Sequence, residues 1–206
     1  MYDQKLQCPV FGTTAVKHKS MHHRIIGHAI VSADGFIADT EGRMPKPLMI
    51  DADWQRFQAE LNLSAVTLLG RLGHEAHPNF KMRRRLVLTS GVNGLRKGDD
   101  APGRVDFLNP NDISLNDALD QLFPTGARVA VVGGTKVFDH VIETIGFDVF
   151  DLVVAKAVML GAGNPCFSKQ GDLGPRDFLL KHNYQEQPAE MLDEKKNVIL
   201  IPFHKP

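Results

Sequence analysis

Two consecutive glycines, Gly133 and Gly134, directly follow an apolar run at 129–132. The run has the length and composition of a buried strand, and apolar residues then recur at helical spacing over 137–145. A chain that turns from a strand into a helix on glycines presents backbone N–H groups at the helix start, and such groups bind anions, above all phosphate. The sequence therefore predicts a site for a phosphorylated ligand. The alternative is a plain strand–helix turn in which glycine only allows close packing.

Other catalytic chemistries find little support. His74 and His77 lie three residues apart, whereas the helical zinc-protease motif places its two histidines four apart, so that both face the metal. The chain has no Gly-x-Ser-x-Gly turn and no cysteine in the setting of a nucleophile. We therefore expect neither a bound metal nor a covalent intermediate.

The composition is that of an ordinary globular chain. Its 206 residues suffice for one domain with a sizeable core, and 43% of them are hydrophobic. The 24 basic and 24 acidic residues balance, so no overall charge favours nucleic acid or a membrane surface as partner. No apolar run reaches the length of a membrane span. Low cysteine use, at Cys8 and Cys166, is typical of a reducing compartment, and we expect a cytoplasmic protein that acts on a small molecule.

The pattern along the chain predicts one domain over 23–206, preceded by a flexible, polar extension at 1–22 that lacks the apolar middle of a secretory signal. Strands are predicted over 25–31, 66–69, 86–88, 104–108, 129–132 and 150–160, and helices over 53–63, 114–122 (N-cap Ser114) and 135–145. The runs 178–191 and 196–203 predict a final antiparallel pair. The alternation of strands and helices indicates an α/β fold in three layers, with a mostly parallel sheet between helices.

Four motifs, each at the end of a predicted strand, resemble those of the dihydrofolate-reductase-like superfamily, in particular the reductase domain of riboflavin biosynthesis. They are Ser-Ala-Asp-Gly-Phe-Ile-Ala at 32–38, Leu-Leu-Gly-Arg at 68–71, Gly-Gly-Thr-Lys-Val-Phe at 133–138, and Asp151 followed by Leu-Gly-Ala-Gly-Asn-Pro at 160–165. They occur in the family's order, and the matching residues spread over nearly all of 24–203. The resemblance implies an eight-stranded sheet that binds NADPH in an extended form.

The resemblance also implies which residues hold this cofactor. Its phosphates would lie at two glycine turns, of which the double-glycine one often contains a cis peptide bond in the family, and its nicotinamide beside the first strand. The cofactor residues are then Ile37, Ala38, Gly70, Arg71, Thr89, Ser90, Val132, Gly133, Gly134, Thr135 and Val137. Arg71 suits a phosphate because a guanidinium donates two parallel hydrogen bonds. The structural alternatives are core packing for the residues at 37–38, a surface arginine at 71, and a polar strand exit at 89–90.

Two acids are the candidate catalytic residues. Asp53 resembles the acid that binds and helps to protonate a pterin in dihydrofolate reductases, and Asp34 resembles the acid next to the substrate in the riboflavin-type members. Either could supply a proton, Asp34 through a bound water. As alternatives, Asp51 is a natural N-cap, Asp53 complements the helix dipole, and Asp-Gly is a common turn. The resemblance adds three substrate-binding candidates to Asp34: Ser32, Gly161 and Gly163, although the two glycines could merely turn the chain.

These observations predict an NADPH-dependent reductase of the riboflavin type, which passes hydride to a ribosylamino-pyrimidine phosphate or a related molecule. A pterin reductase is the alternative within the enzyme class. A second class, a nucleotide-binding module without turnover, is suggested by two departures: Phe36 stands where the riboflavin-type family often has lysine, and Lys46 where dihydrofolate reductases usually have tryptophan. Family members often pair through sheet-edge strands, so the resemblance implies a homodimer.

Overall fold

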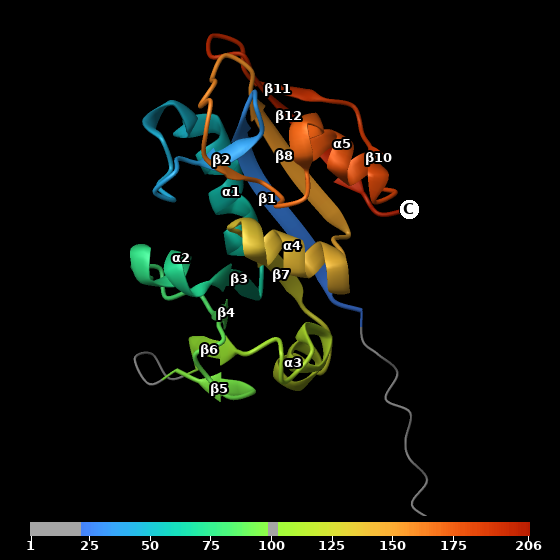
Figure 1. Cartoon of the computed structure of the whole chain (residues 1–206). Coiled ribbons are helices and arrows are strands. Elements are labelled where there is room, and N and C mark those ends of the chain that lie inside the picture. Colours follow the sequence, from blue (N-terminus) through green and yellow to red (C-terminus); the bar gives the residue numbers. More distant parts are fainter. Residues whose placement is uncertain (1–21, 99–102) are drawn as a thin grey trace, which may run out of the picture.

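A computed structural model describes residues 22–98 and 103–206 (Figure 1). The predicted extension, apart from His22, and Cys8 within it lie outside the described residues. The main sheet runs in the order β10-β12-β8-β1-β7-β3-β4-β6-β5, and β11 also pairs with β12. Its strands are β1 (Arg24–Ser32), β3 (Val66–Gly70), β4 (Arg85–Leu88), β5 (Leu95–Lys97), β6 (Val105–Leu108), β7 (Arg128–Val131), β8 (Val149–Ala155), β10 (Gln185–Glu186), β11 (Glu190–Asp193) and β12 (Val198–His204).

The sheet has a parallel centre and antiparallel edges. Strands β8, β1, β7, β3, β4 and β6 pair in parallel, whereas β12 runs antiparallel to β8 and β5 antiparallel to β6. The carboxyl ends of the parallel strands therefore meet at one edge of the sheet, where ligands bind in open α/β sheets. The predicted fold class is confirmed, but the main sheet has 10 strands rather than eight. The short strands β5 and β10 extend its two edges.

Helices cover both faces of the sheet. The core on one face includes buried residues of α3 (Leu115–Leu122), α4 (Thr135–Thr144) and α5 (Gly174–Lys181). Figure 1 shows α4 in front of β7. On β1, alternate side chains face opposite sides, so His28 lies on the other face from Ala29. There it meets α1 (Asp51–Leu63), which follows the short 3-10 helix η1 (Lys46–Leu48).

The centre of the core is aromatic. The Phe147 and Phe150 rings lie edge to face with centroids 4.9 Å apart, and Phe138 of α4 contacts both rings. Such arrangements stabilise a core beyond the area that they bury. Gly27 of β1 makes room for them, since a β-carbon there would lie 2.4 Å from Cδ2 of Phe150.

Several predicted boundaries are wrong. The predicted strand 178–191 begins inside α5, a helix that starts at Gly174-Pro175, and only its end forms β10 and β11. The antiparallel pairing of β11 with β12 confirms the final hairpin. Strand β8 ends at Ala155 instead of residue 160, and β5 is a strand that the sequence pattern did not predict. Ser114 is confirmed as an N-cap, because its hydroxyl oxygen accepts from the Asp117 amide at 3.1 Å. Ile50, not Asp51, is the N-cap of α1.

Helix α1 is fixed to the sheet by ionic contacts. Both carboxylate oxygens of Glu60 accept from Arg128 of β7, at 2.7 Å from Nε and 2.5 Å from Nη2, and the Ser64 hydroxyl donates to the same carboxylate. Burial raises the pKa of Glu60, but the hydrogen bonds from Arg128 and Ser64 outweigh it and hold the pKa below the ordinary 4.5. Glu60 therefore stabilises the fold in its ionised form. None of the helices in the described part of the chain is both long and apolar enough to cross a membrane.

We expect Glu60→Gln to lower the free energy of unfolding at neutral pH by about 1–2 kcal/mol, the scale of a charge-assisted hydrogen bond. A carboxyl with a depressed pKa contributes stability above its unfolded pKa and loses that contribution as pH falls through its folded pKa. The difference from wild type should therefore shrink as pH drops below about 4.5. Urea unfolding at several pH values tests this, with Glu75→Gln, which removes an exposed partner of Arg71, as the control. A pH-independent difference would contradict the assignment.

Candidate functional site

The two predicted glycine turns meet at the carboxyl edge of the sheet. Gly133 and Gly134, the double-glycine turn, follow β7, and Gly70 ends the neighbouring strand β3. The Gly70 amide donates to the Gly133 carbonyl at 3.4 Å, and the Val132 amide donates to the Leu68 carbonyl at 3.0 Å. The peptide bond between the two glycines is cis, as the resemblance implies. The two turns therefore form one continuous backbone surface.

Each glycine of this surface has a different spatial role. Gly133 has a φ of +84°, and a β-carbon there would lie 2.7 Å from the Phe138 ring, so a side chain would be both strained and crowded. A β-carbon on Gly70 would lie 3.3 Å from Val137, which is a tight contact. Gly134 is exposed, and a β-carbon there would have only Ile37 within 4 Å, at 3.9 Å. Gly134 is thus the point at which the backbone is open to a ligand.

Helix α4 begins at this open point. Gly134 is its N-cap and offers no side-chain cap, and the first turn contains no acid. The first amides of a helix have no partner within the helix, and the helix dipole adds partial positive charge there. The Thr135 hydroxyl does not face a ligand, because it donates to the Pro165 carbonyl of β9 (Asn164–Pro165) at 2.5 Å. The exposed Lys136 follows and adds a cation. This end of α4 can therefore hold an anion.

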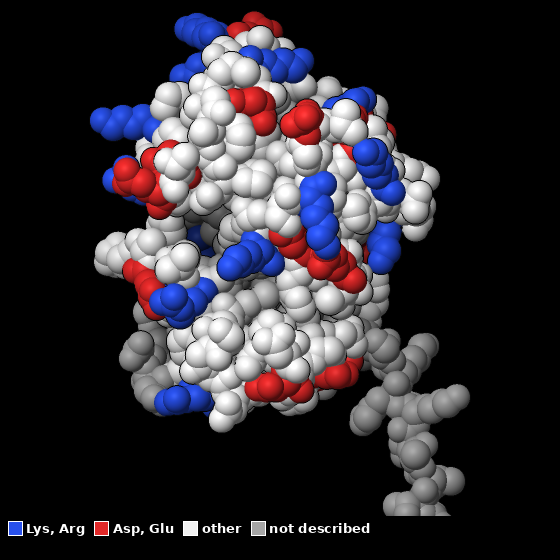
Figure 2. Space-filling view, viewed as in Figure 1, with Lys and Arg blue, Asp and Glu red and all other residues white. Residues whose placement is uncertain are grey.

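Figure 2 shows that the surface is hollowed here, between the part of the molecule that carries β2 (Phe36–Ala38) and the part that carries α2 (Arg71–Ala76), beside α4. Lysine or arginine side chains stand at the rim of this hollow. The hollow and the basic groups at its rim therefore lie beside the amino end of α4.

The residues predicted for the far end of the cofactor lie beside the second glycine turn. Leu88 of β4 is the register partner of Gly70, which places Thr89 next to the start of α2. Arg71 is exposed, and its Nη1 donates to both carboxylate oxygens of Glu75 at 2.8 Å. The Thr89 hydroxyl accepts from the Gly91 amide at 3.1 Å, and Ser90 is exposed. Arg71 can bind a phosphate only if its ion pair with Glu75 breaks. Breaking this pair costs little free energy, because both side chains are exposed to solvent.

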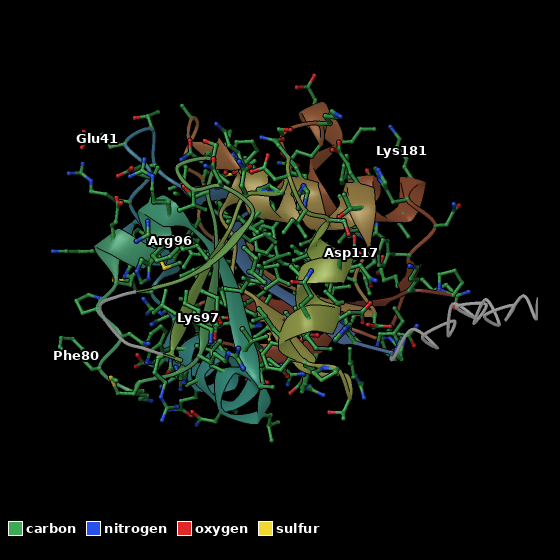
Figure 3. The ribbon with its side chains drawn as sticks, turned by 90° about the horizontal axis from the view of Figure 1, so that it is seen from below. Glu41, Phe80, Arg96, Lys97, Asp117 and Lys181 are labelled. Carbon is green, nitrogen blue, oxygen red and sulfur yellow. The ribbon has the colours of Figure 1, made fainter. Side chains whose placement is uncertain are left out.

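A further basic pair lies on the edge strand β5. Arg96 and Lys97 pair in antiparallel register with Phe107 and Asp106 of β6. Figure 3 labels both side chains, which belong to the edge of the sheet formed by β5. They are separate from the double-glycine turn, since β6, β4 and β3 lie between β5 and β7.

Strand β2 lies over the double-glycine turn. The half-buried Ile37 approaches Gly134, and the backbone of Ala38 is so close to Gly163 that a β-carbon at 163 would collide with the Ala38 carbonyl oxygen. Gly163 therefore allows β2 to pack against the segment before β9, with which it pairs. Ile37 and Ala38, predicted for the cofactor, therefore lie beside Gly163, predicted for the substrate. A strand edge of this kind can donate to and accept from a carboxamide.

The side chains of Asp34 and Ser32 form hydrogen bonds with backbone amides of the protein itself. The Asp34 carboxylate accepts from the Gly161 amide at 2.7 Å and from the Leu160 amide at 3.2 Å. The Ser32 hydroxyl oxygen accepts from the Phe36 amide at 3.1 Å. Burial raises the pKa of Asp34, but hydrogen bonds from Ser32 and these two amides outweigh it and lower the pKa. Asp34 therefore favours the ionised form and fastens the loop before β9 to the end of β1.

Asp34→Asn should loosen this fastening, because an amide group offers only one oxygen and no charge. We expect amide exchange at Leu160 and Gly161 to accelerate and the free energy of unfolding to fall by about 1 kcal/mol. Hydrogen exchange followed by NMR measures both effects. Asp39→Asn is the matched control, since the Asp39 carboxylate contacts its own loop, at the amides of Glu41 and Arg43 and at the Arg43 side chain. Unchanged exchange at 160–161 in the Asp34 variant would refute the anchoring role.

Asp53, in the first turn of α1, is buried and has a partner that the sequence did not predict. His28 Nε2 lies 2.8 Å from Asp53 Oδ1, and the two side chains are only 6% and 9% exposed. The Phe57 ring packs beside the imidazole, with centroids 5.3 Å apart. The sequence does contain one indication of this partner, which is a histidine inside an otherwise apolar strand, between Gly27 and Ala29. Among the described residues, no group of three His, Cys, Asp or Glu side chains is placed to hold a metal ion.

Comparisons with known proteins identify the fold. No family model matches the sequence, and no curated protein matches it. A solved structure of a protein assigned to riboflavin biosynthesis in Shewanella sp. PV-4 is similar, with a TM-score of 0.61 and 17% identity over 88% of this chain and 98% of that one. Dihydrofolate reductase from Enterococcus faecalis, solved with NADP(H) and RAB-propyl, has a TM-score of 0.57 and 19% identity over 88% of this chain and 95% of that one.

A third similar structure is the diaminohydroxyphosphoribosylaminopyrimidine deaminase/5-amino-6-(5-phosphoribosylamino)uracil reductase of Thermotoga maritima. Its TM-score is 0.62 and its identity 19%, over 89% of this chain but 57% of that one, so this chain spans a little more than half of it. The protein described here therefore has the dihydrofolate-reductase-like fold that its motifs indicated.

Proposed function

We propose that this protein is an NADPH-dependent reductase. The observation that carries the proposal is the meeting of two glycine turns at the amino end of α4, where Gly134 leaves the backbone open beside a surface hollow. Backbone amides and a helix dipole in this position suit a diphosphate. Lys136 and Arg71 lie close by as cations for the cofactor's charges. Two of the similar solved proteins are reductases by description, which supports the same class of reaction.

Different residues along the carboxyl edge of the sheet would bind different parts of the cofactor. The double-glycine turn and the backbone amide of Thr135 hold the diphosphate, with Gly70, Val132 and Val137 shaping the surface behind it. Arg71, Thr89 and Ser90 take the adenosine end, and the backbone of Ile37 and Ala38 orients the nicotinamide. NADPH supplies a hydride when bound. The protein accelerates the transfer by aligning donor and acceptor and excluding water.

The acceptor that we propose is a ribosylamino-pyrimidine phosphate, bound near Ser32, Asp34 and the loop at 161–163. Asp34 fixes this loop and would hold the water that supplies the proton accompanying the hydride, whereas Asp53 is the buried acid that would supply it to a pterin. A pterin is the second candidate, favoured by the position of an acid in the first turn of α1. The proposal further includes a cytoplasmic, homodimeric protein that acts on a small molecule.

Turnover assays test this function. Purified protein is mixed with NADPH and a panel of pyrimidine and pterin substrates, and the absorbance of the reduced nicotinamide is followed. Oxidation that survives Asp53→Asn but not Asp34→Asn would support the riboflavin-type site. Saturable NADPH binding without oxidation of any substrate would support a nucleotide-binding module instead, and failure to bind NADPH would contradict both.

A further inference from the structure

The buried pair of His28 and Asp53 bears on which ring the proposed site accepts. His28 is four residues before Ser32 on β1 and therefore on the same face of the strand. Its Nε2 is within hydrogen-bond distance of Asp53 Oδ1, and both residues are 7% exposed. With Asp53 ionised, Nε2–H donates and the carboxylate accepts. One of the two oxygens of Asp53 is thus already taken.

Two acids near this pair, Glu60 and Asp151, have arginine partners of their own. Glu60, one helical turn further along α1 from Phe57, is bound by Arg128. Asp151 of β8 is the register partner of His28 and lies 3.5 Å from Arg56. By contrast, Nδ1 of His28 is buried and has no hydrogen-bond partner among the described residues. A buried polar atom without a partner is costly, and a ligand group can satisfy it.

These contacts favour one kind of ring edge over another. A 2-amino-pyrimidine edge, as in a pterin, presents two parallel N–H donors, and a carboxylate binds it best with both oxygens free. At Asp53 the imidazole N–H competes for one of them. A 2,4-dioxopyrimidine edge presents carbonyl oxygens on either side of one ring N–H. Such an edge can accept from the protonated imidazole or donate to the neutral one, so it complements Nδ1 in both states.

We propose that His28 is a specificity-determining residue. By donating to one carboxylate oxygen of Asp53, it favours the binding of dioxopyrimidine rings over that of 2-amino rings. The inference deepens the proposed reductase function and rests on it. It predicts that freeing Asp53 converts the site toward diaminopyrimidine binding, a gain that a purely structural His28 would not produce.

Calorimetric titration in the presence of NADPH tests the proposal with 5-aminouracil and 5-benzyl-2,4-diaminopyrimidine as probes. Wild type should prefer the uracil probe. His28→Ala should bind the diamino probe at least about tenfold more tightly than wild type, the scale of one charge-assisted hydrogen bond. His28→Gln should bind the diamino probe no more tightly than wild type, because its amide still donates to Asp53. Adding Asp53→Asn to His28→Ala should abolish the gain.

Two results would overturn the proposal. One is a wild-type protein that binds the diamino probe as tightly as the uracil probe, a comparison that needs no variant to fold. The other is a folded His28→Ala protein with no gain for the diamino probe. NADPH affinity is measured separately in each protein by nicotinamide fluorescence. Loss of cofactor binding in wild type would count against the reductase function itself, whereas intact cofactor binding without ring discrimination would count against His28 alone.

Discussion

Replacing Gly134 by alanine is expected to weaken NADPH binding by about 10- to 100-fold, the loss that follows when a charge-assisted hydrogen bond to phosphate is lengthened or broken. The fold should tolerate the change. Gly134 has φ −72° and ψ −159°, an extended conformation open to any residue, and the new methyl group would have only Ile37 within 4 Å, at an ordinary contact distance. The methyl group would instead occupy the open side of the turn, where the diphosphate is proposed to approach the backbone.

Gly73→Ala provides the matched control for this variant. Gly73 lies inside α2, and a β-carbon there meets nothing within 4 Å. Alanine should stabilise the helix by up to about 1 kcal/mol and leave NADPH affinity within about twofold of wild type. Both affinities can be measured by fluorescence titration, with circular dichroism to confirm folding. A folded Gly134→Ala protein with wild-type affinity would show that no phosphate approaches this turn.

Gly27→Ala should produce the largest loss of stability. The new β-carbon would lie 2.4 Å from Phe150 and 2.9 Å from Phe147, and both rings are fully buried in the aromatic core. Tightly packed cores cannot absorb such an overlap without shifting rings or strands. We expect the free energy of unfolding to fall by about 3 kcal/mol, at the upper end of overpacking effects. Urea unfolding measures the change.

If overpacking is the cause, the effects of Gly27→Ala and Phe150→Leu on the free energy of unfolding should depend on each other. In the Gly27→Ala background, Phe150→Leu removes atoms on which the methyl group impinges, so the double variant should be more stable than Gly27→Ala alone. In the wild-type background the same Phe150→Leu change should destabilise the protein, because it leaves a cavity. Opposite signs in the two backgrounds are the signature of contact between the sites. Additive losses would mean that Gly27 acts through backbone flexibility instead.

The sequence predicted structure correctly at positions where the backbone conformation requires a particular residue type. The glycines at 70, 133 and 134 mark strand ends where the backbone must turn or approach closely, and the structure places them side by side. Ser114 identified a helix start through the chemistry of its hydroxyl. By contrast, the apolar residues at 178–180 fit a strand as well as a helix. Gly174-Pro175 was the overlooked sign, since proline is favoured in the first turn of a helix.

The partners of the two acids could not be read from the sequence. Asp53 and His28 are 25 positions apart and meet only because α1 packs on the face of the sheet that carries His28, which no local pattern specifies. Asp34 is 126 and 127 positions from the amides that it binds. Motif spacing identified both acids as candidates, but only the packing showed that one is an ionised anchor and that the other shares a buried hydrogen bond.

Calorimetric titration of the wild-type protein with NADPH, and separately with NADH, tests the central proposal most directly. If the double-glycine turn and the amino end of α4 hold the diphosphate of a pyridine nucleotide, NADPH should release heat and saturate at one molecule per chain. Gly134→Ala should shift that isotherm to higher concentration, and Gly73→Ala should not. The absence of heat and of saturation with both nucleotides would contradict the proposed cofactor site and, with it, the reductase function.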